Sequence, residues 1–178
     1  MTAAEHHPPI VGSADLRLDW TSEEECAAFA QRLAAHPAIG NAFIELHGEL
    51  GAGKTTLVRH ILRALGVQGR IKSPTYAVVE PYVVAVRPEP VEGRPAQDEA
   101  ELAIWHFDFY RFSDPREWED AGFRDLFASP GLKLAEWPQN AGALLPRADL
   151  VVRIEVGADD VRHVTLAAQT PLGRELLQ

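Results

Sequence analysis

The chain has 178 residues, with 17 lysines and arginines against 26 aspartates and glutamates, which gives a formal net charge of −9 at pH 7. Hydrophobic residues make up 46% and charged residues 24%, a composition that excludes a collagen-like chain and argues against a disordered or membrane-embedded one. The acidic balance also argues against a protein that coats nucleic acid by charge, because such binding depends on many Lys and Arg contacts to phosphate.

The sequence favours a cytoplasmic location. No apolar run approaches the roughly 20 residues that a bilayer crossing needs, and the first residues lack the basic and then apolar order of a secretory signal. Cys26 is the only cysteine, so neither an internal disulfide nor a cysteine zinc cluster can form. We expect residues 1–12, which include His6 and His7, to form a flexible tail, and residues 13–178 to form a single domain.

The first predicted elements are a strand and a helix. Apolar and charged residues alternate over residues 16–20, which indicates a short, half-buried strand. Ser22 followed by Glu25 has the spacing of a capping box, and the apolar residues at 26–33 recur at helical spacing. Pro37 then ends this helix.

A buried strand and an amphipathic helix come next. Residues 42–46 are apolar enough for a buried strand, and they run directly into a glycine-rich segment. Residues 54–65 follow the 3.6-residue period of a helix, with Gly66 as its stop.

The middle of the chain predicts a hairpin with a long connection. Residues 76–86 are rich in Val and Tyr and are expected to be extended, and residues 102–109 resume strand character. Between them, residues 87–101 are rich in proline and charge, so we predict a solvated loop rather than a second domain.

The C-terminal part predicts a short helix and three strands. A cap, a first-turn proline and a capping-box partner open a helix within residues 114–122, and residues 132–137 are an apolar run that includes an acid near its end. Residues 150–156 and 161–168 alternate, and the turn residues 157–160 between them predict an antiparallel hairpin.

Residues 48–55, GELGAGKT, fit the P-loop pattern G-x-x-x-x-G-K-[ST] without a mismatch. Glycines allow successive N–H groups to turn inward as a nest for an anion, and the following helix adds the positive end of its dipole. A lysine then reaches the terminal phosphates, and a hydroxyl is available to Mg²⁺. We therefore expect a nucleoside triphosphate to be bound by Gly48, Glu49, Leu50, Gly51, Ala52, Gly53, Lys54, Thr55 and Thr56.

A triphosphate site also needs a carboxylate on the metal side, at the carboxyl end of another strand. Asp108 and Glu136 both stand at such positions, although a solvated acid at a strand end is the alternative for each. Thr75 could sense the terminal phosphate, and a simple turn explains it equally well. None of the three lysines lies in the N-K-x-D segment of common GTPases, so ATP is the expected nucleotide.

Four segments in this order resemble one protein family. They are GELGAGKTT (48–56), KSPTYAVVEPY (72–82), HFDFYRFSDP (106–115) and LAEWPQNAGALLP (134–146), and they resemble the bacterial TsaE family, also called YjeE. The resemblance implies an α/β, three-layer P-loop NTPase fold with a mixed sheet, which has a parallel core plus antiparallel strands and a C-terminal hairpin. It also implies an ATPase that acts with TsaD and TsaB in making threonylcarbamoyladenosine at position 37 of tRNAs reading codons that begin with A.

The resemblance also implies roles for individual residues. Thr55 and Glu136 would ligate Mg²⁺, Asp108 would be important for hydrolysis, and Thr75 would belong to a switch-like segment. For the adenine pocket it suggests Ser22 and Arg162, although Arg162 equally suits the surface of the late hairpin.

Residues 87–101 depart from the family pattern by lengthening one connection. The absence of an arginine-dense lid for an acceptor phosphate favours a nucleotide switch that contacts tRNA only indirectly, through its partners. A small-molecule kinase with the same P-loop and a nucleotide-binding module without turnover are the alternatives.

Overall fold

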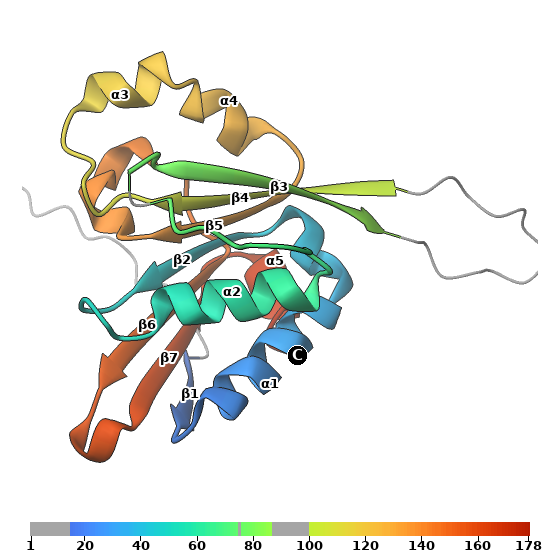
Figure 1. The fold of residues 1–178 in the computed structure, drawn as a ribbon, viewed down its shortest axis with the longest axis vertical. Coiled ribbons are helices and arrows are strands. Elements are labelled where there is room, and N and C mark those ends of the chain that lie inside the picture. The colour runs from blue at the N-terminus through green and yellow to red at the C-terminus, as the bar shows by residue number, and fades with distance from the viewer. Residues whose placement is uncertain (1–14, 75, 87–99) are drawn as a thin grey trace, which may run out of the picture.

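A seven-stranded mixed sheet organises the structure, a computed structural model that describes residues 15–74, 76–86 and 100–178 (Figure 1). The strand order is β1-β7-β6-β2-β5-β4-β3. The strands are β1 (Asp15–Trp20), β2 (Phe43–His47), β3 (Val79–Val86), β4 (Ala100–Asp108), β5 (Leu132–Glu136), β6 (Leu150–Val156) and β7 (Arg162–Ala168). The helices are α1 (Glu23–Ala35), α2 (Lys54–Ala64), α3 (Pro115–Asp120), α4 (Phe123–Ala128) and α5 (Pro171–Glu175).

Four neighbouring strands form the parallel core of the sheet. β2 pairs in parallel with β6 on one side and with β5 on the other, and β5 pairs in parallel with β4. The outer pairs β1–β7, β6–β7 and β3–β4 are antiparallel, so the predicted α/β fold, with its parallel core and C-terminal hairpin, is confirmed. Because the carboxyl ends of parallel strands meet at one edge, the segments that follow β2, β4 and β5 come together there.

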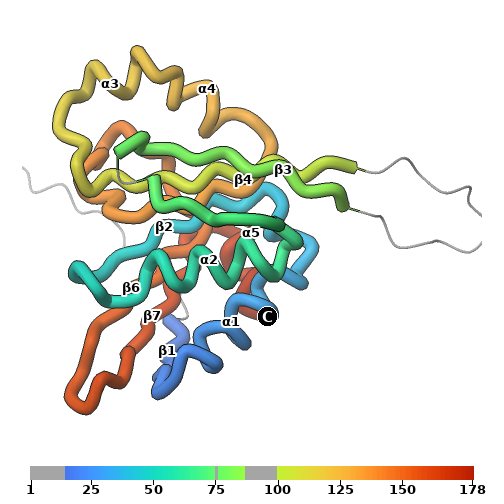
Figure 2. Tube along the Cα trace, in the orientation of Figure 1, coloured from blue at the N-terminus to red at the C-terminus, as the bar shows by residue number. Residues whose placement is uncertain are grey.

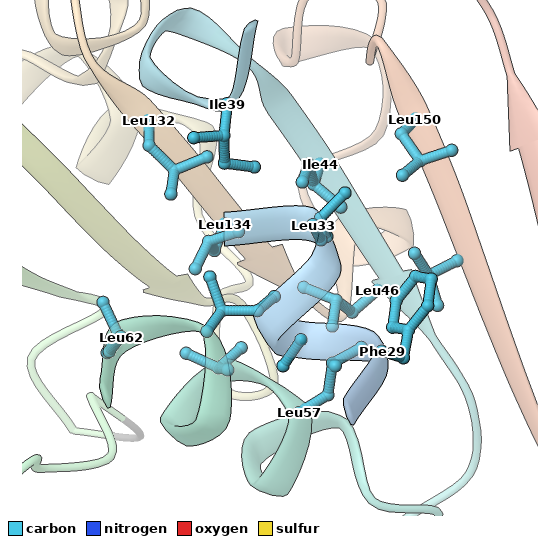
Figure 3. Packing of buried hydrophobic residues seen from close by; sticks show 14 of the residues in the cluster. Phe29, Leu33, Ile39, Ile44, Leu46, Leu57, Leu62, Leu132, Leu134 and Leu150 are labelled. Atoms are coloured by element: carbon cyan, nitrogen blue, oxygen red, sulfur yellow. The ribbon is translucent and has the colours of Figure 1, made fainter. Parts of the chain in front are cut away.

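One face of the sheet packs against α1 and α2 (Figure 3). The buried residues of α2 recur at helical spacing, and they meet Leu46 of β2 and Leu134 of β5 in the same hydrophobic cluster. Burying one Leu or Ile side chain stabilises a fold by about 1.5–3 kcal/mol, so this face fixes α2 firmly against the sheet. The residues of α2 that do so are Leu57, Val58, Ile61 and Leu62.

The opposite face carries α3 and α4, which lie on the other side of the sheet from α1 and α2 (Figure 1). Its core is aromatic: the rings of Phe107 and Phe109 are stacked at 5.6 Å, and Phe123 of α4 meets Phe107 edge-on at 5.5 Å. Successive residues of a strand point to opposite faces. On β4, Phe107 therefore belongs to this aromatic core, whereas Ile104 belongs to the core under α2.

Most predicted elements are confirmed, but the hairpin differs in two places. β3 begins at Val79 rather than at residue 76, because the Val78 N–H donates to the Pro74 carbonyl and closes a turn first. β4 begins at Ala100, so the last two residues of the predicted 87–101 loop are strand instead, paired with the end of β3. In Figure 2, the chain path of β3 and β4 runs beyond the last turn of α2.

Two short helices, α4 and α5, were not predicted. α4 follows Gly122, whose φ of 67° lies in the left-handed region, so the predicted stop of α3 is also the start of another helix. The predicted tail at 1–12 and the predicted loop over 87–99 lie outside the described residues. In the ranges that the structure does describe, no helix is both long and apolar enough to cross a membrane.

Candidate functional site

The P-loop occupies the connection between β2 and α2, at the carboxyl edge of the parallel strands. Gly48 has a φ of 153°, and a Cβ built there would lie 2.5 Å from the carbonyl oxygen of Ile154. Gly53, the N-cap of α2, has a φ of 112°. L-residues rarely adopt these angles, so both positions require glycine, and Gly48 also needs the space.

The amino end of α2 is open to a ligand. Gly53 is the N-cap of this helix and has no side chain, so the cap residue itself makes no side-chain hydrogen bond to the first N–H groups. The first N–H groups of a helix have no intrahelical partner, and the helix dipole makes this end positive. An anion such as a phosphate is the natural acceptor here.

Lys54 is held over the P-loop by its own backbone. Its Nζ donates to the carbonyl oxygens of Gly48 at 2.6 Å and Glu49 at 2.8 Å. An ammonium group has three donors, so one N–H remains for a phosphate oxygen. Burial lowers the pKa of Lys54, while the nearby carboxylates, chiefly Glu136 and Asp108, oppose that shift and favour the charged form.

Thr55, the residue after Lys54, contacts the side chain of Glu136. The Thr55 hydroxyl lies 2.9 Å from Oε1 and 2.8 Å from Oε2 of the Glu136 carboxylate, which is only 2% exposed. A hydroxyl and a carboxylate are hard oxygen donors that suit Mg²⁺, which keeps several waters and uses few protein groups. Two protein oxygens would leave the other coordination positions of such an ion to waters and phosphate oxygens.

Asp108 lies beside Glu136 because the two strand-end residues are in register on β4 and β5. Residues in register on parallel strands share a face, so both carboxylates lie on the α2 side. The Oδ1 atom of Asp108 accepts the Tyr110 N–H at 3.0 Å, and its own N–H donates to the Val78 carbonyl at 2.8 Å. Asp108 is thereby fixed within the same pocket as the P-loop lysine.

Two neighbouring pockets flank the start of α2. The first has a volume of 260 Å³ and is lined by P-loop residues together with Asp108 and Glu136. The second has a volume of 310 Å³ and is lined by Ser22 and Arg162, among others. Both are lined by Gly53 and Thr56, so a ligand with its phosphates in the first could extend into the second; Ala52 also lines the second.

The structure places most of the predicted site residues that it describes in the two pockets, whereas Gly48 and Glu49 line neither of them. Ser22 lies in the second pocket while its hydroxyl also accepts the Glu25 N–H at the start of α1, and Arg162 there donates to the Asp160 carbonyl. Leu50, at the tip of the P-loop, is 75% exposed. Glu49 contributes its carbonyl to Lys54. The predicted Thr75 lies outside the described residues.

Two aromatic residues of the site were missed by sequence reasoning. The Lys54 ammonium lies 4.4 Å from the ring centroid of Trp137, an arrangement that attracts a cation to the ring. Tyr110 packs its ring 5.0 Å from that of Trp137, and both line the phosphate pocket. The available signals were their positions, one residue after Glu136 for Trp137 and two after Asp108 for Tyr110, within two of the segments that resemble the family.

Comparison with known proteins identifies the family of this chain. The family model described as "Threonylcarbamoyl adenosine biosynthesis protein TsaE" matches residues 20–164. A TsaE from Haemophilus influenzae is 42% identical over 134 residues, covering 75% of each chain, and one from Bacillus subtilis is 31% identical over 154 residues, covering 85% of this chain and 86% of that protein. The crystal structure of Bacillus subtilis YdiB superposes with a TM-score of 0.66 at 26% identity, covering 93% of each chain. The chain belongs to the TsaE family.

Proposed function

We propose that this protein binds ATP with Mg²⁺ and hydrolyses it. The observation that carries the proposal is the contact between the Thr55 hydroxyl and the buried Glu136 carboxylate, next to a lysine with one N–H to spare and the open end of α2. These groups would supply ligands for a phosphate chain and for a divalent cation at the start of α2.

The residues divide the work as follows in this proposal. The P-loop N–H groups and Lys54 bind the phosphates, while Thr55 and Glu136 hold Mg²⁺. When bound, this ion would neutralise charge on the phosphate oxygens. Asp108 orients the attacking water, which its neighbour Glu136 cannot do while it serves the cation. Thr75 remains a prediction as a switch residue.

We further propose that the nucleotide cycle acts on the protein partners TsaD and TsaB, in threonylcarbamoyl transfer to adenosine 37 of tRNAs that read codons beginning with A. The family's role in threonylcarbamoyladenosine biosynthesis supports this step. A formal net charge of −9 favours indirect contact with tRNA, through the partners. We place this activity in the cytoplasm. Triphosphate and Mg²⁺ would order one conformation, and hydrolysis would release it.

The test is ATP turnover by the full chain alone, with TsaD, with TsaB and with both together. A switch predicts that turnover rises with the partners, whereas a small-molecule kinase predicts a rise with a metabolite acceptor instead. A binding module predicts no ADP in any mixture. Lys54→Met is the inactive control, and turnover that survives in this variant would mean that the activity comes from another site or from a contaminant.

A further inference from the structure

His106 is a buried polar residue that the proposed roles leave unused. It lies on β4, two residues before Asp108 and on the same face of the sheet, and it has no exposed surface. Its Nε2 atom lies 2.7 Å from Oε1 of Glu136. Its Nδ1 atom is buried and finds no hydrogen-bond partner among the residues that the structure describes.

The two ring nitrogens indicate how the imidazole is oriented. A carboxylate oxygen accepts and does not donate, so the His106 proton that matters is on Nε2, directed at Glu136. The opposite nitrogen gains nothing from its surroundings in the described part of the chain, and a buried polar atom without a partner is unfavourable. Away from Asp108 and Glu136, the neighbouring positions on this face, Ile104 and Leu134, are apolar. Core packing alone therefore gives no reason for a histidine on the Nδ1 side of this position.

What histidine supplies, and an apolar side chain does not, is a fixed donor behind Glu136. The carboxylate contacts two groups from different elements: the imidazole of β4 at Oε1, and the Thr55 hydroxyl of α2 across both oxygens. If the imidazole were removed, the Thr55 hydroxyl would be the one of these two contacts left to orient the Glu136 carboxylate. In the proposed function, the same Thr55 hydroxyl is a ligand of Mg²⁺.

We propose that His106 is a positioning residue for the magnesium site: by donating from Nε2 to Oε1, it holds the Glu136 carboxylate in the orientation that Mg²⁺ requires. This inference rests on the proposed function, because it assigns His106 a role toward the cation held by Thr55 and Glu136. Donors behind a metal ligand typically change metal affinity by about 10- to 100-fold when they are removed.

The experiment measures the affinity of the full chain for a non-hydrolysable ATP analogue, once with saturating Mg²⁺ and once with EDTA. The ratio of the two dissociation constants is the gain due to Mg²⁺. We expect His106→Leu to reduce this gain by about 10- to 100-fold while leaving the affinity in EDTA unchanged. His106→Gln, whose amide nitrogen can replace Nε2, should restore the gain to near the wild-type value.

Ile104→Ala is the matched control, because Ile104 lies two residues earlier on the same strand and face and is equally buried. It should lower the melting temperature and leave the gain intact, which separates positioning from core stability. If His106→Leu does not fold, His106→Asn, whose amide is too short to reach Glu136, takes its place.

A folded His106→Leu or His106→Asn variant with the wild-type gain would overturn the inference while leaving the proposed function standing. So would an equal loss of the gain in Ile104→Ala. A wild-type chain that gains nothing from Mg²⁺ would overturn the proposed function itself, and the inference with it.

Discussion

Replacing Lys54 by Met isolates the contribution of one N–H to phosphate binding. Two of the three ammonium donors are used by the carbonyls of Gly48 and Glu49, so the variant loses the one charge-assisted hydrogen bond left for the ligand. Such a bond is worth about 1.5–3 kcal/mol, which corresponds to about 10- to 160-fold weaker binding.

The assay is thermal unfolding with and without ATP and Mg²⁺. At about 100 times the wild-type dissociation constant, the nucleotide stabilises the wild-type fold by about 2.7 kcal/mol, a rise in melting temperature of about 5–11 °C for a chain of this length. With binding weakened as above, the same concentration stabilises Lys54→Met by about 0.3–1.4 kcal/mol, a rise of about 1–6 °C.

Lys133 provides a matched control. It is as buried as Lys54, with 4% exposure, burial likewise lowers its pKa, and its ammonium lies 5.2 Å from the ring centroid of Trp105. It stands near the start of β5, however, at the end of the strand opposite Glu136. Lys133→Met should keep the full nucleotide shift. A full shift in Lys54→Met, or an equal loss in both variants, would refute the assignment of Lys54 to the phosphates.

Three further changes test other parts of the site. Asp108→Asn should retain most of the nucleotide shift yet lose turnover at least about 100-fold, because orientation of the attacking water is lost while the phosphate ligands stay; equal loss of binding would remove Asp108 from the catalytic role. Gly48→Ala should lower the free energy of unfolding by about 1–3 kcal/mol in urea titration, since a Cβ would collide with the Ile154 carbonyl oxygen, and an unchanged midpoint would contradict that backbone geometry. Burial raises the pKa of the Cys26 thiol to about 11, so less thiolate is present at pH 8 and alkylation should be at least about 100-fold slower than in the urea-unfolded chain; equal rates would show that the thiol is exposed.

The phosphate end of the site was predictable because it is local in sequence. The P-loop pattern specifies glycines, a lysine and a hydroxyl within one turn between a strand and a helix, and the structure has that turn between β2 and α2. Asp108 and Glu136 were predictable as candidates because each ends an apolar strand. Their separate roles came from the family resemblance and not from the strand pattern, since register decides which acid meets Thr55, and register depends on the neighbouring strands.

The remaining features depend on contacts between distant segments. The early turn that delays β3 is held by the Asp108 N–H, which donates to the Val78 carbonyl from 30 residues further along the chain. Val78 itself has a φ of 66°, an angle that sequence propensity would never assign to a β-branched residue. The helices α4 and α5 have only 6 and 5 residues, too short for a hydrophobic period to stand out.

The lining of the second pocket depends on the strand order of the sheet as well as on the P-loop. Ser22 and Arg162 are 140 positions apart, yet β1 ends just before Ser22 and pairs with β7, which begins at Arg162. The register of that pair matches Trp20 with Arg162, and this brings Ser22 and Arg162 into one pocket with Gly53 and Thr56 at the start of α2. The resemblance to a family suggested these two residues, and the antiparallel addition of β7 and β1 explains why they share one pocket.

The alternation of side chains along β4 determines which chemistry faces the P-loop. Counting by two from Ile104 places His106 and then Asp108 on the α2 face, while Trp105 and Phe107 face the aromatic core. A shift of one residue in the pairing of β4 with β5 would exchange these two sets. It would put the imidazole and the carboxylate under α3 and α4 and leave Glu136 without its buried donor. The aromatic packing of Phe107 with Phe109 and Phe123 opposes that shift, so the hydrophobic core far from any ligand fixes the register on which the cation site depends.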